Sequence, residues 1–136
     1  MKVTVIDTSA LIRLYVPDGP VPSGLEDAIE DAWRGDGALL MPNLALVEAA
    51  QVLCKKEQRG FLSAEEVDEI FDAILDLPIE TIGHRDLLVE ALALARAHAL
   101  TMYDALFLAT AKARKAELIT ADAALRKAFK KLGVVQ

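Results

Sequence analysis

The feature that most constrains this fold is the alternation of short apolar runs with longer helical patterns. Runs rich in aliphatic residues, typical of buried strands, lie at residues 3–6, 38–41, 79–82 and 118–120. Helical patterns of ten residues or more lie between them. Strands joined by connections of this length run parallel, because antiparallel strands need only a tight turn. The sequence therefore predicts an α/β protein with a mainly parallel sheet of four to five strands, the fifth at residues 134–135.

Capping residues and helix breakers mark where the helices begin and end. Ser63 and Glu66 have the spacing of a capping box, and the helix behind them should end before Pro78. Asn43 is expected to cap a helix that runs to Gln58. The expected helices cover residues 10–16, 25–34, 44–58, 64–77, 86–98, 103–114 and 123–131.

Length and composition indicate one globular domain over residues 1–136. The chain is 54% hydrophobic and 26% charged, which suits a packed core. Its single cysteine, Cys54, excludes an internal disulfide, and its apolar helix predicts a core position. No apolar run approaches the ~18 residues of a membrane span, and the first residues are charged too soon for a signal peptide. We therefore expect a cytoplasmic protein without a membrane partner.

The charge is unevenly distributed along the chain. A formal net charge of −6 argues against a protein that binds nucleic acid through charge alone. Residues 96–136 nevertheless hold eight Lys or Arg against three acids, so this segment carries +5 and residues 1–95 carry −11. These cations could form a basic face for phosphate, or could simply be solvated helix positions. Four earlier cations could line a groove or could simply be solvated helix positions; they are Arg13, Lys55, Lys56 and Arg59.

Four acidic residues are candidates for a site at one edge of the parallel sheet. Asp7 follows the first strand and Asp122 the fourth, and ligands of open α/β sheets bind beyond the carboxyl ends of the strands. Glu48 lies inside an apolar helix, and Asp104 opens another. Each has an ordinary alternative: Asp7 and Asp122 are good helix caps, Asp104 completes a capping box with Thr101, and Glu48 could belong to a narrow solvated stripe.

Taken together, the four acids favour a metal site. Carboxylates held a few ångströms apart repel one another unless a cation lies between them. Oxygen ligands without His or Cys suit the hard ions Mg²⁺ and Mn²⁺. One or two such ions can activate water and stabilise the leaving oxygen of a phosphodiester.

The residues around these acids resemble the motifs of the PIN-domain family, and most closely those of its VapC-type toxins from toxin–antitoxin modules. In this resemblance Asp7, Glu48, Asp104 and Asp122 are the catalytic metal ligands, and the hydroxyls of Ser9 and Thr120 support them. Ala121 departs from the pattern, since many relatives carry a polar residue there. The four matching segments are VIDTSAL at 5–11, LVEA at 46–49, YDA at 103–105 and TADAAL at 120–125.

The resemblance implies a three-layer α/β/α fold and a Mg²⁺- or Mn²⁺-dependent ribonuclease that cleaves single-stranded RNA. It also implies a homodimer and a cognate VapB-type antitoxin whose tail enters the active-site groove. The main alternative is a non-catalytic PIN-like scaffold or antitoxin-binding module. Phosphoryl transfer through an aspartyl nucleophile fits poorly, because Ser9 stands where haloacid-dehalogenase-like phosphatases carry a second Asp.

Overall fold

A single parallel sheet forms the centre of the molecule. The computed structural model describes residues 1–133, and its four strands lie in the order β3-β2-β1-β4. All three neighbouring pairs are parallel, which confirms the predicted α/β class. The strand expected at residues 134–135 lies outside the described residues. The strand bounds are β1 (Lys2–Ile6), β2 (Gly37–Pro42), β3 (Ile79–Ile82) and β4 (Glu117–Ile119).

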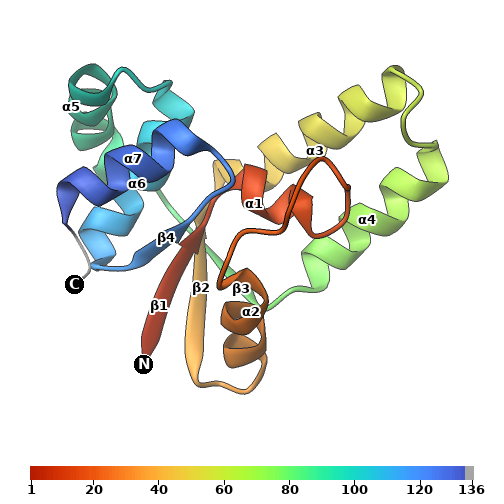
Figure 1. The fold of residues 1–136 in the computed structure, drawn as a ribbon, viewed down its shortest axis with the longest axis horizontal. Helices are drawn as coiled ribbons and strands as arrows, with labels where there is room; N and C mark the ends of the chain where they lie inside the picture. The colour runs from red at the N-terminus through yellow and green to blue at the C-terminus, as the bar shows by residue number, and fades with distance from the viewer. Residues whose placement is uncertain (134–136) are drawn as a thin grey trace.

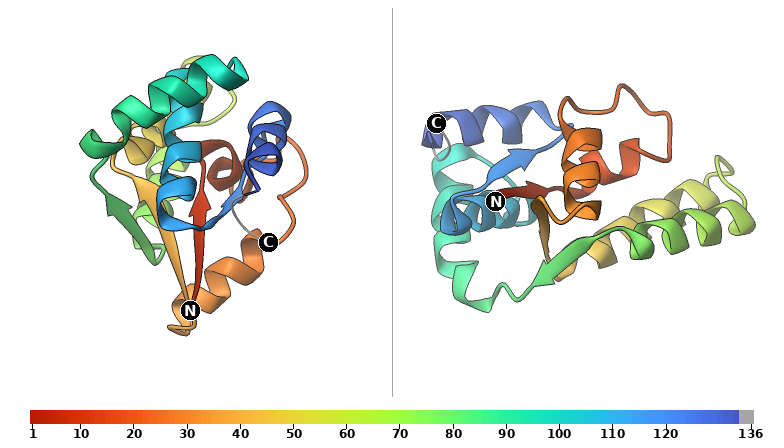
Figure 2. Two further views of the ribbon diagram at one scale, coloured as in Figure 1. Left: turned by 90° about the vertical axis from the view of Figure 1, so that its left-hand side faces the viewer. Right: turned by 90° about the horizontal axis from the view of Figure 1, so that it is seen from below.

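Helices cover both faces of the sheet and give the expected three layers. In Figure 1 the sheet stands between α5, α6 and α7 on one side and α2, α3 and α4 on the other. Helices α3 and α4 form a hairpin that extends well beyond the sheet (Figures 1 and 2). The helices are α1 (Thr8–Arg13), α2 (Leu25–Trp33), α3 (Leu44–Gln58), α4 (Ala64–Asp76), α5 (Leu88–His98), α6 (Met102–Arg114) and α7 (Ala123–Leu132), with a 3₁₀ turn, Arg85–Leu87, before α5.

The middle of the core is built from β1 and α6. Val5 pairs with Leu40 on one side and Leu118 on the other, and Val5 and Ile6 are completely buried. Residues 105–111 of α6 are all buried, because the helix packs on β1, β2 and β4 and is itself covered by α5. A helix that is apolar on every side is stable only in such a position. The rigid end of β1 therefore carries Asp7 into the centre of the molecule.

The structure confirms the predicted capping box of α4 and contradicts the predictions for Asn43 and Cys54. The capping box is present: Ser63 accepts the N–H of Glu66, whose side chain accepts the N–H of Ser63. Asn43 precedes α3 but its side chain caps nothing, because its helical backbone angles and its N–H bond to the Ile82 carbonyl keep it attached to β3. The core position predicted for Cys54 is wrong. Only one face of α3 is buried, and Cys54 is turned about 100° away from Leu53 on that face, into solvent.

Candidate active site

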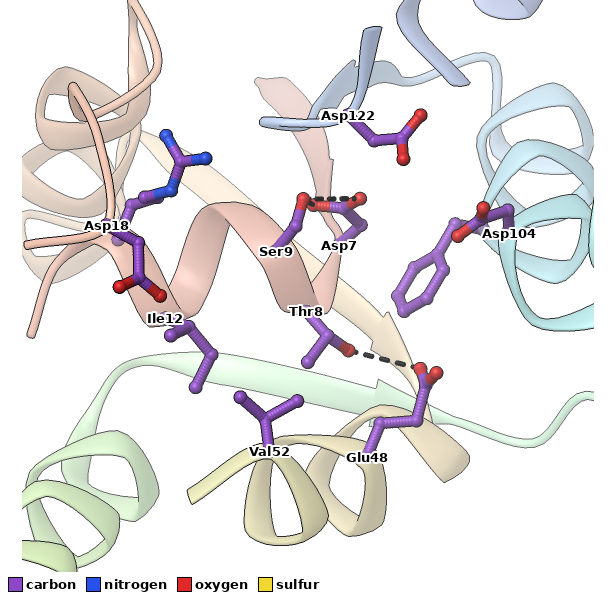
Figure 3. A pocket seen from close by; sticks show the side chains of 11 residues that line it. Asp7, Thr8, Ser9, Ile12, Asp18, Glu48, Val52, Asp104 and Asp122 are labelled. Atoms are coloured by element: carbon purple, nitrogen blue, oxygen red, sulfur yellow. Dashed lines mark hydrogen bonds between the residues drawn. The ribbon is translucent and has the colours of Figure 1, made fainter. Parts of the chain in front are cut away.

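All four acids predicted from the sequence line one pocket. It lies beyond the carboxyl ends of β1 and β4 and has a volume of about 340 Å³. Figure 3 shows the carboxylates of Asp7, Glu48, Asp104 and Asp122 directed toward a common space from four different elements. Its other lining residues are Thr8, Ser9, Ile12, Arg13, Asp18, Val52 and Phe107.

Asp7 is the most deeply buried of the acids, with 2% of its surface exposed. Its carboxylate accepts the Ala10 N–H at 2.9 Å, so it caps α1, and accepts the Thr120 hydroxyl at 2.5 Å. The Ser9 hydroxyl lies 2.8 and 3.0 Å from its two oxygens. Burial nevertheless raises the pKa of Asp7, an effect that these bonds only partly offset and that the charge of Asp104 reinforces. The cap role and a functional role therefore coexist.

Ser9 and Thr120 join the two strand ends that form the pocket. Thr120 accepts the Asp122 N–H at 2.9 Å while its own hydroxyl donates to Asp7. Ser9 accepts the Ala121 N–H at 3.1 Å, so residue 121 contributes its backbone and no polar side chain is needed for this bond. Both hydroxyls thus hold the Asp7 carboxylate and the turn into α7 in one fixed arrangement.

Glu48 enters the pocket from α3, where it is partly buried. The Thr8 hydroxyl donates to its Oε1 at 3.1 Å (Figure 3). Burial raises the pKa of Glu48, and the charges of Asp104 and Asp7 raise it further. These facts favour a functional carboxylate over a solvated stripe. Sequence reasoning gave Thr8 no role, because forty positions separate it from Glu48 and no local pattern links them.

Asp104 and Asp122 complete the pocket from α6 and α7. The Thr101 side chain accepts the Asp104 N–H at 3.1 Å, which is the first of the two bonds of the predicted capping box. Burial raises the pKa of Asp104, and the neighbouring charge of Asp122 raises it further. Asp122 caps α7 by accepting the Leu125 N–H at 2.9 Å. Glu48 and Asp122 thus accept these bonds on one oxygen each, whereas both oxygens of Asp7 accept hydrogen bonds.

The pocket has an excess of negative charge. Among residues 1–133, no ion pair involves any of the four acids. Arg13, one of the four early cations expected either to line a groove or to be solvated, is the one Lys or Arg that lines the described pocket. It stands four residues after Ser9, so both lie on one face of α1. No Lys or Arg of residues 96–133 lines this pocket: Lys112 pairs with Glu90, and Arg126 and Lys130 line a different cavity.

The donor set fits a hard divalent cation. In the described part of the chain, no three His, Cys, Asp or Glu side chains are close enough to enclose one ion directly. Mg²⁺ rarely needs such a cage, since it usually keeps several waters and binds through one or two carboxylates. Four oxygen donors without a cationic partner, three of them with raised pKa values, match that mode of binding.

Comparisons with known proteins agree with this architecture. The family model of the PIN domain matches residues 4–131. Ribonuclease VapC3 of Pyrobaculum aerophilum is 31% identical over 127 residues, which cover 92% of this chain and 93% of the relative. Three solved structures share the fold. PAE2754 of Pyrobaculum aerophilum has a TM-score of 0.71 and 23% identity, and the match covers 96% of this chain and 93% of that one. The sarcin-ricin-loop-cleaving toxin VapC20 of Mycobacterium tuberculosis has a TM-score of 0.63 and 14% identity, with coverage of 92% and 94%. A toxin–antitoxin complex of Klebsiella pneumoniae has a TM-score of 0.55 and 23% identity, with coverage of 98% and 95%. The chain therefore belongs to the PIN-domain family, in its VapC group.

Proposed function

We propose that this protein is the toxin of a VapBC-type module, a metal-dependent endoribonuclease that hydrolyses RNA phosphodiester bonds. The observation that carries the proposal is the convergence of four carboxylates, without a cationic partner, in one pocket. The printed names of two relatives support it, since one is a ribonuclease and the other a toxin that cleaves the sarcin-ricin loop.

Asp7, Glu48, Asp104 and Asp122 would hold Mg²⁺ or Mn²⁺, which when bound supplies an activated water and neutralises charge on the phosphate. The chain itself provides the orientation. Thr120, Ser9 and the Ala10 N–H fix both oxygens of Asp7, and Thr8 fixes Glu48. These bonds prevent the carboxylates from turning away, so little reorganisation remains for the reaction.

Arg13 has a separate role in this proposal. Arg13 lines the acidic pocket, and its guanidinium donates to the Pro20 carbonyl at 3.2 Å, an exposed bond that a phosphate can replace. A guanidinium binds phosphate through two parallel bonds. It would therefore draw the phosphodiester toward the acids, which alone would repel it.

The partners are part of the proposal. A structural neighbour from Klebsiella pneumoniae is a toxin–antitoxin complex, which supports a VapB-type antitoxin for this chain as well. We propose a homodimer as the free form. In the described residues, no helix has the length and apolar character needed to cross a membrane.

The test is cleavage of structured and single-stranded RNAs in Mg²⁺, Mn²⁺ or EDTA. Asp7→Asn and Asp104→Asn should each abolish cutting while the protein stays folded. Asp72→Asn, an exposed position on α4, is the matched control and should cut normally. Cutting that survives both pocket substitutions would refute the assignment. A folded protein that binds metal but cuts none of the RNAs would support the non-catalytic PIN-like scaffold instead.

A further inference from the structure

A second cavity adjoins the acidic pocket and has no role in the chemistry described so far. It lies between α3 and the first turn of α6 and has a volume of about 490 Å³. Glu48 and Val52 line both cavities, so the two adjoin at these side chains. We call this cavity the side groove; its remaining lining residues are Leu44, Val47, Gln51, Lys55 and Tyr103.

The side groove carries an exposed aromatic ring beside the acids. Tyr103 is 55% exposed, although large aromatic side chains are usually buried for most of their surface. Its neighbour in sequence is Asp104, whose carboxylate faces the acidic pocket. A group that stacks on the Tyr103 ring therefore lies next to the candidate active site, which the adjacent residue Asp104 lines.

The groove also carries a cation without a partner. Lys55 forms no ion pair or side-chain hydrogen bond with residues 1–133, whereas the next residue, Lys56, pairs with Asp18 at 2.7 Å. Lys55 follows Glu48 by seven positions on α3, which is two helical turns or ~10 Å along the axis. A phosphate held by Lys55 therefore belongs to a neighbouring nucleotide and not to the bond that is cut.

We infer that the side groove binds the nucleotide next to the scissile phosphate of a single-stranded RNA, with its base stacked on Tyr103 and its outer phosphate bound by Lys55. This assignment rests on the proposed ribonuclease function. The combination of aromatic face and cation along one groove is the means by which proteins bind unpaired nucleic acid. Only an unpaired base can stack on a side chain in this way, so a duplex is excluded from the groove. The groove thereby adds a second cation, Lys55, to the one that lines the acidic pocket, Arg13.

Equilibrium binding of a fluorescein-labelled single-stranded oligoribonucleotide tests the inference, measured by anisotropy in EDTA and again in Ca²⁺. Tyr103→Ala should raise the Kd about 5- to 100-fold, and Tyr103→Phe should restore binding, because stacking needs the ring and not the hydroxyl. Lys55→Ala should weaken binding and reduce the slope of log K against log salt by about 0.7. Two matched controls should bind normally: Trp33→Ala, another exposed aromatic, and Lys2→Ala, at the opposite end of β1.

Three results would overturn the inference. They are wild-type affinity in both groove variants, an equal loss in the controls, and no binding by the unchanged protein in either condition. Retained RNA binding with loss of 1-anilinonaphthalene-8-sulfonate binding in Tyr103→Ala would instead assign the groove to an apolar protein segment. Because binding is measured without cleavage, failure here is separable from failure of the proposed function, which is judged by the Asp7→Asn and Asp104→Asn cleavage assays.

Discussion

Thr120→Val removes a single buried hydroxyl that connects two of the pocket's acids, Asp7 and Asp122. Thr120 is 2% exposed, and its hydroxyl donates to Asp7 at 2.5 Å while accepting the Asp122 N–H at 2.9 Å. Valine has nearly the same shape, so the change deletes these bonds without leaving a cavity. A hydrogen bond to a charged group contributes about 1.5–3 kcal/mol, and an unpaired buried N–H costs about 1–3 kcal/mol. With partial compensation by the added methyl group, we expect a loss of about 2–4 kcal/mol at neutral pH.

The loss should depend on pH in a defined direction. Burial holds the folded-state pKa of Asp7 above its ordinary value of 3.8, so stability falls as pH rises from about 4 through the folded-state pKa. The Thr120 bond lowers that pKa, and its removal raises the pKa further. The difference in unfolding free energy between the wild type and the Thr120→Val variant should therefore be smallest below pH ~4 and grow until Asp7 is ionised in both proteins.

Urea unfolding in EDTA across this pH range measures the effect. Thr110→Val is the matched control: Thr110 is 0% exposed, but its hydroxyl donates to the Leu106 carbonyl at 2.7 Å inside α6 and touches no charge. Its cost should be at most ~1 kcal/mol and independent of pH, because the carbonyl keeps its helical N–H partner. Thr120→Ser should recover most of the stability. A pH-independent loss at Thr120, or one no larger than at Thr110, would refute the reasoning.

Three further predictions follow from the same structure. Asp104→Asn should raise the unfolding free energy of the metal-free protein at pH 7 by up to ~1 kcal/mol, since it removes a partly buried charge repelled by Asp122; a lower urea midpoint would contradict this. Mg²⁺ or Mn²⁺ at a hundred times its Kd should stabilise the protein by about 2.7 kcal/mol in calorimetry and release protons, because the ligands have raised pKa values. An equal shift in Asp7→Asn would place the ion elsewhere. Ser63→Ala should cost about 1 kcal/mol in urea unfolding, since the Glu66 N–H loses its hydroxyl acceptor while the backbone N–H of residue 63 can still donate to Glu66. An unchanged midpoint would show that α4 does not need its cap.

Local signals predicted those parts of the structure that local interactions determine. Asp7 and Asp122 could be placed because each follows a short apolar strand and caps the next helix, and Ser63 could be placed because its partner Glu66 is three residues away. Glu48 stood out through its apolar surroundings in sequence. The shared edge of a parallel sheet favoured one metal site for these acids, and the resemblance to the PIN-domain family supported the same grouping.

Long-range packing determined the rest. The strand order depends on which strands pair across the sheet, and the bond from Thr8 to Glu48 depends on how α3 packs on α1. No window of sequence contains either arrangement. From the sequence, Lys55 and Lys56 were indistinguishable as neighbouring cations. In the structure Lys56 pairs with Asp18 and Lys55 lines the side groove, because successive helix positions point about 100° apart. Cys54 was misplaced for the same reason.

The position of β1 also has a consequence for how the protein is made. β1 lies inside the sheet between β2 and β4, and Thr120, which follows β4, comes 113 positions after Asp7. During synthesis, Asp7 therefore lacks the hydroxyl of Thr120, its strongest hydrogen-bond donor, until residue 120 has been made. A nascent chain that ends before residue 120 lacks the Thr120 bond to Asp7 and one of the pocket's four acids, Asp122, so the site can assemble only after these residues have been synthesised.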